Sequence, residues 1–302
     1  MTMNYAIGLD IGGTSIKALA VMPGGRVLAQ TTVPTGDTGK RGWRVNVSRA
    51  KDELQGHLHH PPSWIGLAAP GLAASDQTSI AFMPGRMPGL EGLVWEKFFK
   101  ASCPVPIMND AHAALLGEVW RGAARSSRNV ILLTLGTGVG GAAMVDGQLL
   151  RGHLGRAGHF GHISLDSGGK PDIVGTPGSL EDAIGNCTAQ ARSGGRFDAT
   201  HALVAAANSG DADARRVWLQ SVRALAVGIV SLVNALDPEV VVIGGGIARA
   251  KAALLRPLNR FLDEIEWRPG GRKVRVELAK LGDRAGAFGA AWNAIQFEHN
   301  PR

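Results

Sequence analysis

The sequence predicts an α/β protein built from two domains, and three observations lead to this prediction. Short apolar runs typical of buried strands alternate with longer stretches of helical periodicity. The chain has 302 residues, 45% hydrophobic and 19% charged, which is enough for two globular domains with ample cores. A strand–turn–strand unit also occurs twice, at a constant offset that places Gly12 on Gly136. Two copies of one unit suggest two similar domains.

The first copy of this unit spans residues 6–21. An apolar run carries Asp10 at its end, two glycines and Thr14 follow, and a second apolar run ends before Pro23-Gly24-Gly25. This pattern predicts a β-hairpin with a tight glycine turn. N–H groups bared by glycine can approach a phosphate, and the carboxylate beside them can hold hydrated Mg²⁺. Taken alone, the segment is equally compatible with an ordinary hairpin that has a polar tip.

The second copy spans residues 129–145. Its turn contains Thr134, Gly136, Thr137 and Gly138. The segment also includes a formal G-x-G-x-x-G pattern, which is the dinucleotide-binding fingerprint. A dinucleotide loop must open a helix, whereas here the second apolar run leads straight into Asp146-Gly147, a hairpin turn. We therefore predict a second phosphate-gripping hairpin and no Rossmann loop.

The other elements follow from periodicity and from glycine and proline breakers. In the first half we expect strands at 27–33, 64–69 and 105–108, and helices at 45–59, 91–101 and 111–122. In the second half we expect helices at 198–209, 211–236, 252–266 and 286–297, and strands at 240–243 and 274–278. The segment Gly244-Gly-Gly246 leads from a strand toward a helix expected from Ala248, where a nucleotide can pack.

Two polar segments outside the hairpins are candidates for a chemical role. Asp110 follows Asn109 at the end of a predicted strand, and α/β folds commonly place chemistry there. The alternative role for Asp110 is the N-cap of the next helix, and position alone leaves both open. His159 and His162 suggest a metal, but H-x-x-H needs a third ligand, and the neighbouring glycines argue against a helix. Hydrogen bonding to a polar ligand is the favoured role for these histidines. Farther on, Ser179-Leu-Glu-Asp182 has the form of a capping box.

Composition and charge narrow the functional class. The formal charge is +7, but the basic residues are scattered, which indicates a solvated surface rather than a nucleic-acid footprint. Cys103 and Cys187 supply neither a disulfide framework nor a metal-binding spacing. We find no charged leader with an apolar core and no apolar run of about 18 residues, so we expect a cytoplasmic protein without membrane contact.

In order and spacing, these motifs resemble those of the ROK family (repressors, open reading frames, sugar kinases) over nearly the whole chain. The residues that carry the resemblance are Leu9–Thr14, Ala69-Pro-Gly71, Asn109-Asp110, Thr134–Gly138, Gly158–His162, Glu181 and Ile243–Gly246. The resemblance implies the actin-like ATPase (ribonuclease H-like) fold, in which two α/β domains enclose the active site in the cleft between them. It also implies a first domain of residues 1–116 plus 286–302, a second of residues 117–285, and a homodimer.

The resemblance further implies an ATP-dependent phosphotransferase whose acceptor is a hydroxyl of a sugar or sugar-like polyol. Asp110 would be the general base that takes the proton of the attacking hydroxyl. The residues expected to bind the sugar are Asn109, His159, His162, Glu181, Arg86 and Gly71. Those expected to hold ATP are Asp10, Gly12, Gly13, Thr14, Lys17, Thr134, Gly136, Thr137, Gly138, Gly244 and Gly245, with Asp10 positioning Mg²⁺ through water.

Three departures from the family pattern concern the acceptor site. His159 replaces the usual glutamate, so a group that only accepts hydrogen bonds has become one that also donates. Arg86 replaces an asparagine that often precedes Leu-Pro-Gly, and it could contact an anionic substituent or face solvent. Many members carry a zinc loop whose three thiolate positions are here Asp172, Val174 and Ser179. We therefore predict no structural zinc, with a residual metal site at His159, His162 and Asp172 as a minor alternative.

Three other functions stand beside the kinase. A transcriptional repressor would need an added helix-turn-helix, and only about five residues precede the first strand. A sugar-binding regulatory protein with weak or no kinase activity is favoured by His159 and Arg86 and opposed by the intact Asp10 and Asp110. Polyphosphate as the donor in place of ATP rests on the basic charge alone.

Overall fold

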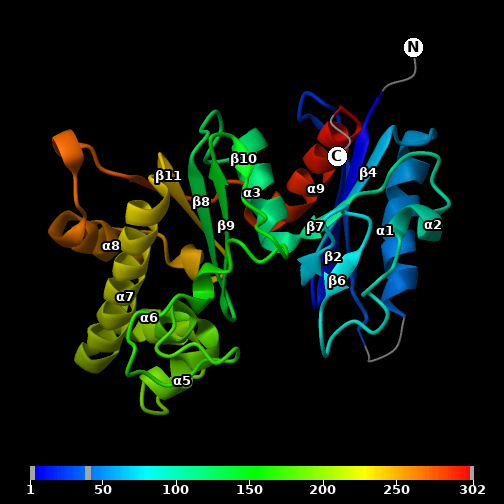
Figure 1. Ribbon diagram of the computed structural model, residues 1–302. Coiled ribbons are helices and arrows are strands. Elements are labelled where there is room, and N and C mark those ends of the chain that lie inside the picture. The colour runs from blue at the N-terminus through cyan, green and yellow to red at the C-terminus, as the bar shows by residue number, and fades with distance from the viewer. Residues whose placement is uncertain (1–3, 38–41, 300–302) are drawn as a thin grey trace. The chain divides into compact units, whose positions relative to one another are not determined.

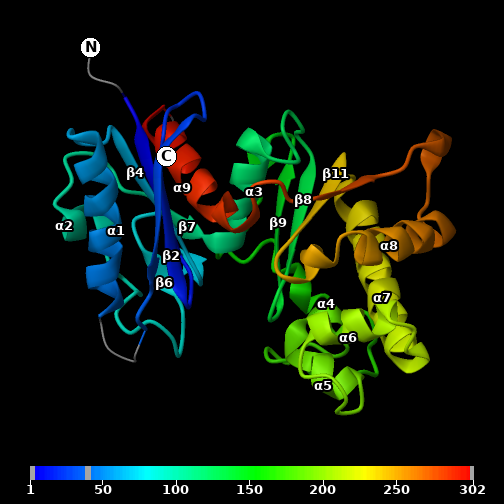
Figure 2. The ribbon, with the colours of Figure 1, turned by 180° about the vertical axis from the view of Figure 1, so that it is seen from behind.

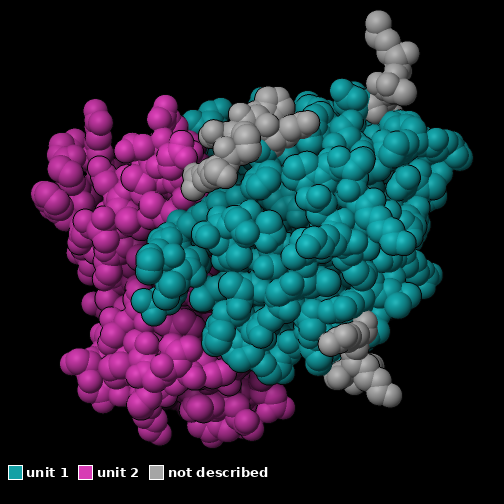
Figure 3. Space-filling model, turned by 45° about the vertical axis from the view of Figure 1, so that its right-hand side comes forward, with its two compact units in different colours: residues 1–126, 151–157, 280–302 teal, residues 127–150, 158–279 magenta. Residues whose placement is uncertain are grey.

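The structure, a computed structural model, describes residues 4–37 and 42–299. The chain divides into two compact units: unit 1 comprises residues 1–126, 151–157 and 280–302, and unit 2 comprises residues 127–150 and 158–279 (Figure 3). Compared with the first domain expected from the sequence, unit 1 also takes residues 117–126, 151–157 and 280–285. Residues 1–3, 38–41 and 300–302 of that expected domain lie outside the described residues.

Unit 1 is built on a five-stranded sheet of order β3-β2-β1-β4-β7 (Figure 1). Its strands are β1 (Ala6–Ile11), β2 (Ser15–Val21), β3 (Val27–Pro34), β4 (Trp64–Ala69) and β7 (Ile107–Asn109), and β5 (Leu72–Ala73) and β6 (Ile80–Phe82) form a separate small sheet. Strands β1, β4 and β7 are parallel, whereas β2 is antiparallel to both β1 and β3. The helices of unit 1 are α1 (Trp43–Leu58), α2 (Trp95–Phe99), α3 (Asp110–Arg121) and α9 (Ala285–His299).

Helices cover both faces of this sheet, so unit 1 has three layers. Helix α1 lies on one face and buries Trp43, Val47 and Leu54 completely, whereas α9 lies on the other face and α3 packs behind it (Figures 1 and 2). Helices α3 and α9 cross closely because each has a glycine in contact with the backbone of the other. A Cβ built on Gly117 or on Gly289 would collide with a carbonyl oxygen of the opposite helix. Glycine therefore allows α9, from the end of the chain, to enter the core of unit 1.

Helix α2 is shorter than predicted, because residues 91–94 are not helical. Glu91 forms a parallel bridge with Ile80, and its carboxylate accepts a hydrogen bond from the Met83 backbone N–H. Gly92 has φ +68°, which is incompatible with a helix. Contacts with distant residues thus overrode the local helical pattern at this position.

Unit 2 is built on a second five-stranded sheet, of order β10-β9-β8-β11-β12. Its strands are β8 (Val130–Leu135), β9 (Val139–Val145), β10 (Gln148–Leu149), β11 (Val240–Gly244) and β12 (Arg275–Leu278). Its α-helices are α4 (Leu180–Ile184), α5 (Ala189–Arg192), α6 (Thr200–Asn208), α7 (Ala212–Leu236) and α8 (Ala252–Ile265). Short 3₁₀ helices include η1 (Phe160–His162), η2 (Asn186–Thr188) and η3 (Ile247–Ala250).

The two sheets have the same topology, which confirms the duplication predicted from the hairpins. In unit 2, β8, β11 and β12 are parallel, and β9 is antiparallel to both β8 and β10, as β2 is to its neighbours in unit 1. Strand β8 runs into β9 through a hairpin rather than into a helix, so the rejection of a Rossmann loop is also confirmed.

Helix α7 is long and apolar enough, by length and composition, to cross a membrane. In unit 2 its apolar residues are packed against neighbouring elements: Val222, Leu225 and Ile229 are completely buried in the hydrophobic core. The indole Nε1 of Trp218 donates to the Ala253 carbonyl oxygen of α8 at 2.9 Å. The apolar length of α7 is thus accounted for by its place as the central helix of this core.

Candidate functional site

Four predicted site residues of unit 1 lie along one edge of its sheet. Asp10 is the penultimate residue of β1, Gly71 follows β4, and Asn109 and Asp110 stand at the junction of β7 and α3. The register pairs Asp10 with Ala68, and Ala69 with Asn109. Because β1, β4 and β7 are parallel, their carboxyl ends meet at this edge, where α/β proteins usually bind their ligands.

The junction of β7 and α3 separates two roles that the sequence left open. Asn109 is the N-cap of α3: its Oδ1 accepts from the N–H groups of Ala111 at 2.9 Å and His112 at 3.2 Å. The alternative in which Asp110 caps the helix is therefore wrong. Asn109 Nδ2 also donates to the Gly71 carbonyl oxygen at 3.0 Å, which ties two neighbouring strand ends together. Asp110 is the first helical residue and its side chain is exposed.

Asp10 occupies an environment with excess negative charge. Burial and the nearby Asp110 raise its pKa from 3.8 to about 7, and Asp283 adds to the effect, although Lys17 opposes it. Lys17 lies directly opposite Asp10 in the β1–β2 register. Carboxylate oxygens are the ligands that Mg²⁺ prefers, and a divalent cation would offset the repulsion that raises this pKa. The residues present therefore fit a magnesium ion.

Gly286, in the first turn of α9, is a neighbour of Asp10 that the sequence did not reveal. A Cβ built on Gly286 would lie 2.5 Å from Asp10 Oδ2, so the carboxylate rests against the start of this helix. A helix N-terminus favours a negative charge. The glycine gave no signal because the two residues stand at opposite ends of the chain.

The glycine turn at residues 12–14 is braced by a second residue that sequence reasoning missed. Thr35, which is completely buried, donates through Oγ1 to the Gly12 carbonyl oxygen at 2.6 Å and through its N–H to the Thr14 carbonyl oxygen at 3.0 Å. The Arg86 guanidinium lies against Gly13, where a Cβ would collide with Nη2. Arg86, which the sequence assigned to the sugar, is thus beside the expected phosphate turn.

The corresponding turn of unit 2 is held by backbone and by Glu181. The Gly136 N–H donates to the Gly138 carbonyl oxygen at 2.9 Å, and the N–H groups of η2 bind the Gly136 and Thr137 carbonyl oxygens. Glu181 Oε2 accepts from the Val139 N–H at 2.9 Å and lies against Gly138. One oxygen of Glu181 therefore supports the expected phosphate turn in addition to any contact with a sugar.

Gly244 and Gly245 lie beside this turn. Gly244 pairs with Thr134 in the β11–β8 register, and Gly245 has φ +86° with its Cα packed onto the Leu135 backbone. Both the backbone angle and the close packing require glycine at position 245. The helix expected from Ala248 is instead the 3₁₀ turn η3, and α8 begins only at Ala252, because Lys251 adopts φ +48°.

His162 is bound by the carboxylate of Asp172, which stands at one of the three thiolate positions of the family pattern. Its Nδ1 lies 2.8 Å from Asp172 Oδ2, and the Asp172 side chain has 0% exposure. Within residues 4–37 and 42–299, the structure contains no group of three or more histidine, cysteine, aspartate or glutamate side chains that could hold a metal. His159 precedes η1, and its carbonyl oxygen accepts from the His162 N–H at 3.1 Å.

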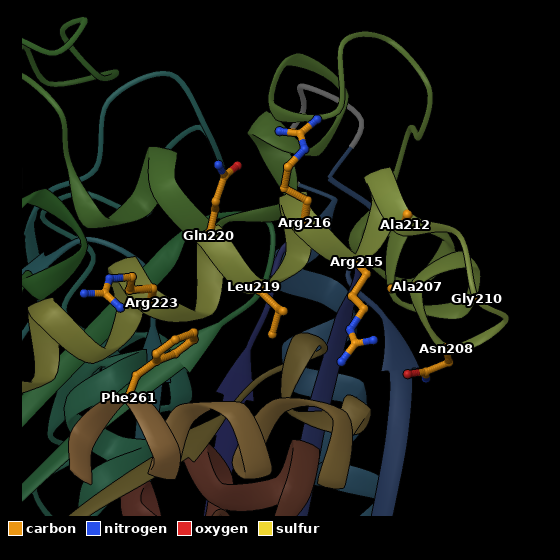
Figure 4. A pocket seen from close by; sticks show the side chains of 10 residues that line it. All are labelled: Ala207, Asn208, Gly210, Ala212, Arg215, Arg216, Leu219, Gln220, Arg223 and Phe261. Carbon is orange, nitrogen blue, oxygen red and sulfur yellow. The ribbon is translucent and has the colours of Figure 1, made fainter. Parts of the chain in front are cut away.

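A cavity of about 840 Å³ in unit 2 involves none of the predicted site residues. It is lined by α6, α7 and α8, and Figure 4 shows Arg223 next to the Phe261 ring, with its guanidinium carbon 5.4 Å from the ring centroid. Arg216 pairs with Asp213 and Arg223 with Glu264, both at 3.3 Å. Acidic neighbours therefore already balance two of its three arginines, and we assign it no ligand.

Comparisons with known proteins show which family and which fold the chain resembles. The sequence profile of the ROK family matches residues 6–296. The chain is 32% identical to a glucokinase of Halalkalibacterium halodurans, over 99% of this chain and 98% of that protein, and 29% identical to an N-acetylmannosamine kinase of Yersinia pseudotuberculosis, over 96% and 98%. A ROK hexokinase structure from Thermus thermophilus matches with a TM-score of 0.83 and 32% identity, covering 98% of this chain and all of that one. A ROK glucokinase from Streptomyces griseus in complex with glucose and AMPPNP matches with a TM-score of 0.79 and 28% identity, covering 97% and 100%.

Proposed function

Since this chain belongs to the ROK family and has its actin-like ATPase fold, we propose that it is a sugar kinase that transfers the γ-phosphate of ATP to a sugar hydroxyl. The observation that carries the proposal is the pair Asp10 and Asp110, brought together at the carboxyl edge of the unit 1 sheet beside a glycine turn. Phosphoryl transfer depends on positioning and on charge stabilisation rather than on a covalent intermediate. Asp110 would position the acceptor hydroxyl, and Asp10 would position the cation that stabilises the charge.

For the donor, we propose that the two glycine turns hold the phosphates of ATP and that Gly244 and Gly245 border the adenosine. The AMPPNP complex of the Streptomyces griseus relative supports ATP as the donor. Bound Mg²⁺ would neutralise charge on the phosphates, and Asp10 would hold it, through water, beside Lys17. The place of Arg86 against Gly13 supports a phosphate oxygen, rather than a sugar hydroxyl, as its partner.

For the acceptor, Asp110 takes the proton of the attacking hydroxyl. Its exposed side chain supports this role. Asn109 is the N-cap of α3, and Asp110 Oδ1 shares the Ala111 N–H with it at 2.9 Å. Asn109, His159, His162, Glu181 and Gly71 bind the other hydroxyls. The activities named for the relatives support a hexose or an N-acylhexosamine as the acceptor class. We further propose that the protein is cytoplasmic and that it is a homodimer. Light scattering of the purified protein tests the homodimer.

The test is ADP release from ATP and Mg²⁺ with glucose, mannose, fructose, N-acetylglucosamine, N-acetylmannosamine and sorbitol, and with long-chain polyphosphate as a second donor. We expect turnover of at least one sugar and a loss of about 10²-fold or more in kcat for Asp110→Asn. Asp52→Asn, which changes an exposed carboxylate on α1, is the matched control and should behave like the wild type. No turnover of any sugar refutes the kinase, and sugar binding without turnover favours a regulatory role. Activity that survives Asp110→Asn refutes the base.

A further inference from the structure

Asp172 is the centre of a hydrogen-bonded cluster, and the mechanism above gives Asp172 itself no role. Its Oδ2 contacts His162 Nδ1 at 2.8 Å, and its Oδ1 accepts from the N–H groups of Val174 at 3.0 Å and Thr176 at 2.9 Å. The side chain is fully buried, whereas that of His162 is 23% exposed. A buried carboxylate thus binds one ring nitrogen of a partly exposed imidazole.

The ionisation of Asp172 decides which nitrogen of His162 carries the proton. Burial alone would raise the pKa of Asp172, but the hydrogen bonds from His162, Thr176, Val174 and Ser179 lower it to about 2. An ionised carboxylate can only accept hydrogen bonds, so His162 Nδ1 must donate. In the neutral imidazole, Nε2 is then unprotonated and able to accept.

The same cluster reaches the helix that carries Glu181. Ser179, which lowers the pKa of Asp172 through its hydroxyl, is the N-cap of α4, and its Oγ accepts from the Asp182 N–H at 3.2 Å. The Leu180 N–H donates to the Ile163 carbonyl oxygen at 3.0 Å, which joins α4 to the end of η1. Asp172 therefore links the two short helices that present His162 and Glu181.

We propose that Asp172 is a positioning residue of the acceptor site, which fixes His162 as an Nδ1–H tautomer so that Nε2 accepts a hydrogen bond from a sugar hydroxyl. The inference rests on the proposed sugar-kinase function and deepens it. The hydrogen-bond partner of His162 is then a sugar hydroxyl that acts as the donor. A site built to accept from a hydroxyl discriminates against an analogue that lacks it, because the partly buried imidazole nitrogen is left unpaired.

The kinetic test uses Asp172→Asn, His162→Gln and the double variant, with the sugar of the panel that has the highest kcat/KM. We expect Asp172→Asn to raise the KM for sugar about tenfold, equivalent to about 1.4 kcal/mol, with the KM for ATP unchanged. In the His162→Gln background, Asp172→Asn should have no further effect on that KM. Asp166→Asn is the matched control, because Asp166 forms a similar turn through the Gly168 N–H at 2.9 Å on the same loop.

A second measurement is independent of turnover and of whether Asp172→Asn folds. Long-range ¹H–¹⁵N spectra of the wild type, with the His162 signals assigned by their loss in His162→Gln, should show a protonated Nδ1 and an unprotonated Nε2 at pH 8. An Nε2–H tautomer overturns the proposal, as does an additive effect of the two substitutions on the KM for sugar. If no sugar is turned over, the kinase function fails while the spectra still decide the state of His162.

Discussion

Replacing Asp10 by asparagine should make the free protein more stable at alkaline pH while abolishing its kinase activity. The carboxylate is held at the edge of the unit 1 sheet beside Asp110 and Asp283, whose charges outweigh the opposing effect of Lys17 on its pKa. The amide of asparagine has nearly the same shape but stays neutral at every pH. The substitution therefore removes an unfavourable buried charge together with the proposed support for Mg²⁺.

The size of the effect follows from the pKa of Asp10, which is about 7 in the folded chain against a reference value of 3.8. Because the folded state binds the proton more tightly, the folded chain loses stability relative to the unfolded chain as pH rises from about 4 to about 7. Each pKa unit corresponds to about 1.4 kcal/mol, so the loss reaches about 4 kcal/mol at most above pH 7. At about 2 °C per kcal/mol, this is a difference of about 8 °C in Tm.

Thermal unfolding of the wild type and Asp10→Asn, with EDTA and without nucleotide, measures this difference at pH 5 and at pH 8. We expect the Tm of the variant relative to the wild type to be higher at pH 8 than at pH 5. In the Asp110→Asn background, the effect of Asp10→Asn on Tm should differ less between pH 5 and pH 8, because a neighbouring charge that raises the pKa of Asp10 is absent. If the Tm difference between wild type and Asp10→Asn is the same at both pH values, the assignment of a raised pKa to Asp10 is refuted.

Three further substitutions test other parts of the structure. Gly289→Ala should lower the free energy of unfolding by about 3 kcal/mol in a denaturant titration, because its Cβ would collide with the Ala113 carbonyl oxygen, whereas Gly24→Ala, which meets nothing, should have no effect. Equal effects of the two would contradict the close helix crossing. Asn109→Ala should cost about 1 kcal/mol of stability through the lost cap, and unchanged stability would argue against that cap. Arg86→Met should weaken the binding of AMPPNP about tenfold more than that of ADP in calorimetry, and equal losses would place Arg86 away from the γ-phosphate.

The hairpin in each sheet was accessible from the sequence because it depends on local patterns, whereas the parallel pairing of β1 with β4 and of β8 with β11 joins distant segments. Each hairpin consists of two apolar runs around a glycine turn, and a repeated pattern predicts a repeated topology. The exchange of roles between Asn109 and Asp110 was not accessible. Both residue types cap helices well, and only the backbone at Asn109, with φ −62° and ψ 145°, decides which of them does so.

Contacts between distant segments account for the remaining differences. Thr35 and Gly286 support the turn and the carboxylate of unit 1, yet neither belongs to a recognisable motif. The helical pattern of residues 91–101 was shortened by the bridge between Glu91 and Ile80, which local periodicity cannot detect. Arg86 and Glu181 were found as site residues, but their contacts with the glycine turns required the structure.

The place of α9 has a consequence for how the protein is made. Unit 1 begins at the first strand, but its core includes a helix from the last part of the chain, and Gly286 of that helix adjoins Asp10. During synthesis from the N-terminus, unit 2 can complete its own sheet as soon as β12 has emerged, whereas the first sheet still lacks the helix that covers it. The carboxylate edge of unit 1 therefore acquires its final surroundings only after α9 has left the ribosome. A truncated chain would carry every motif of the kinase except the helix against which Asp10 rests.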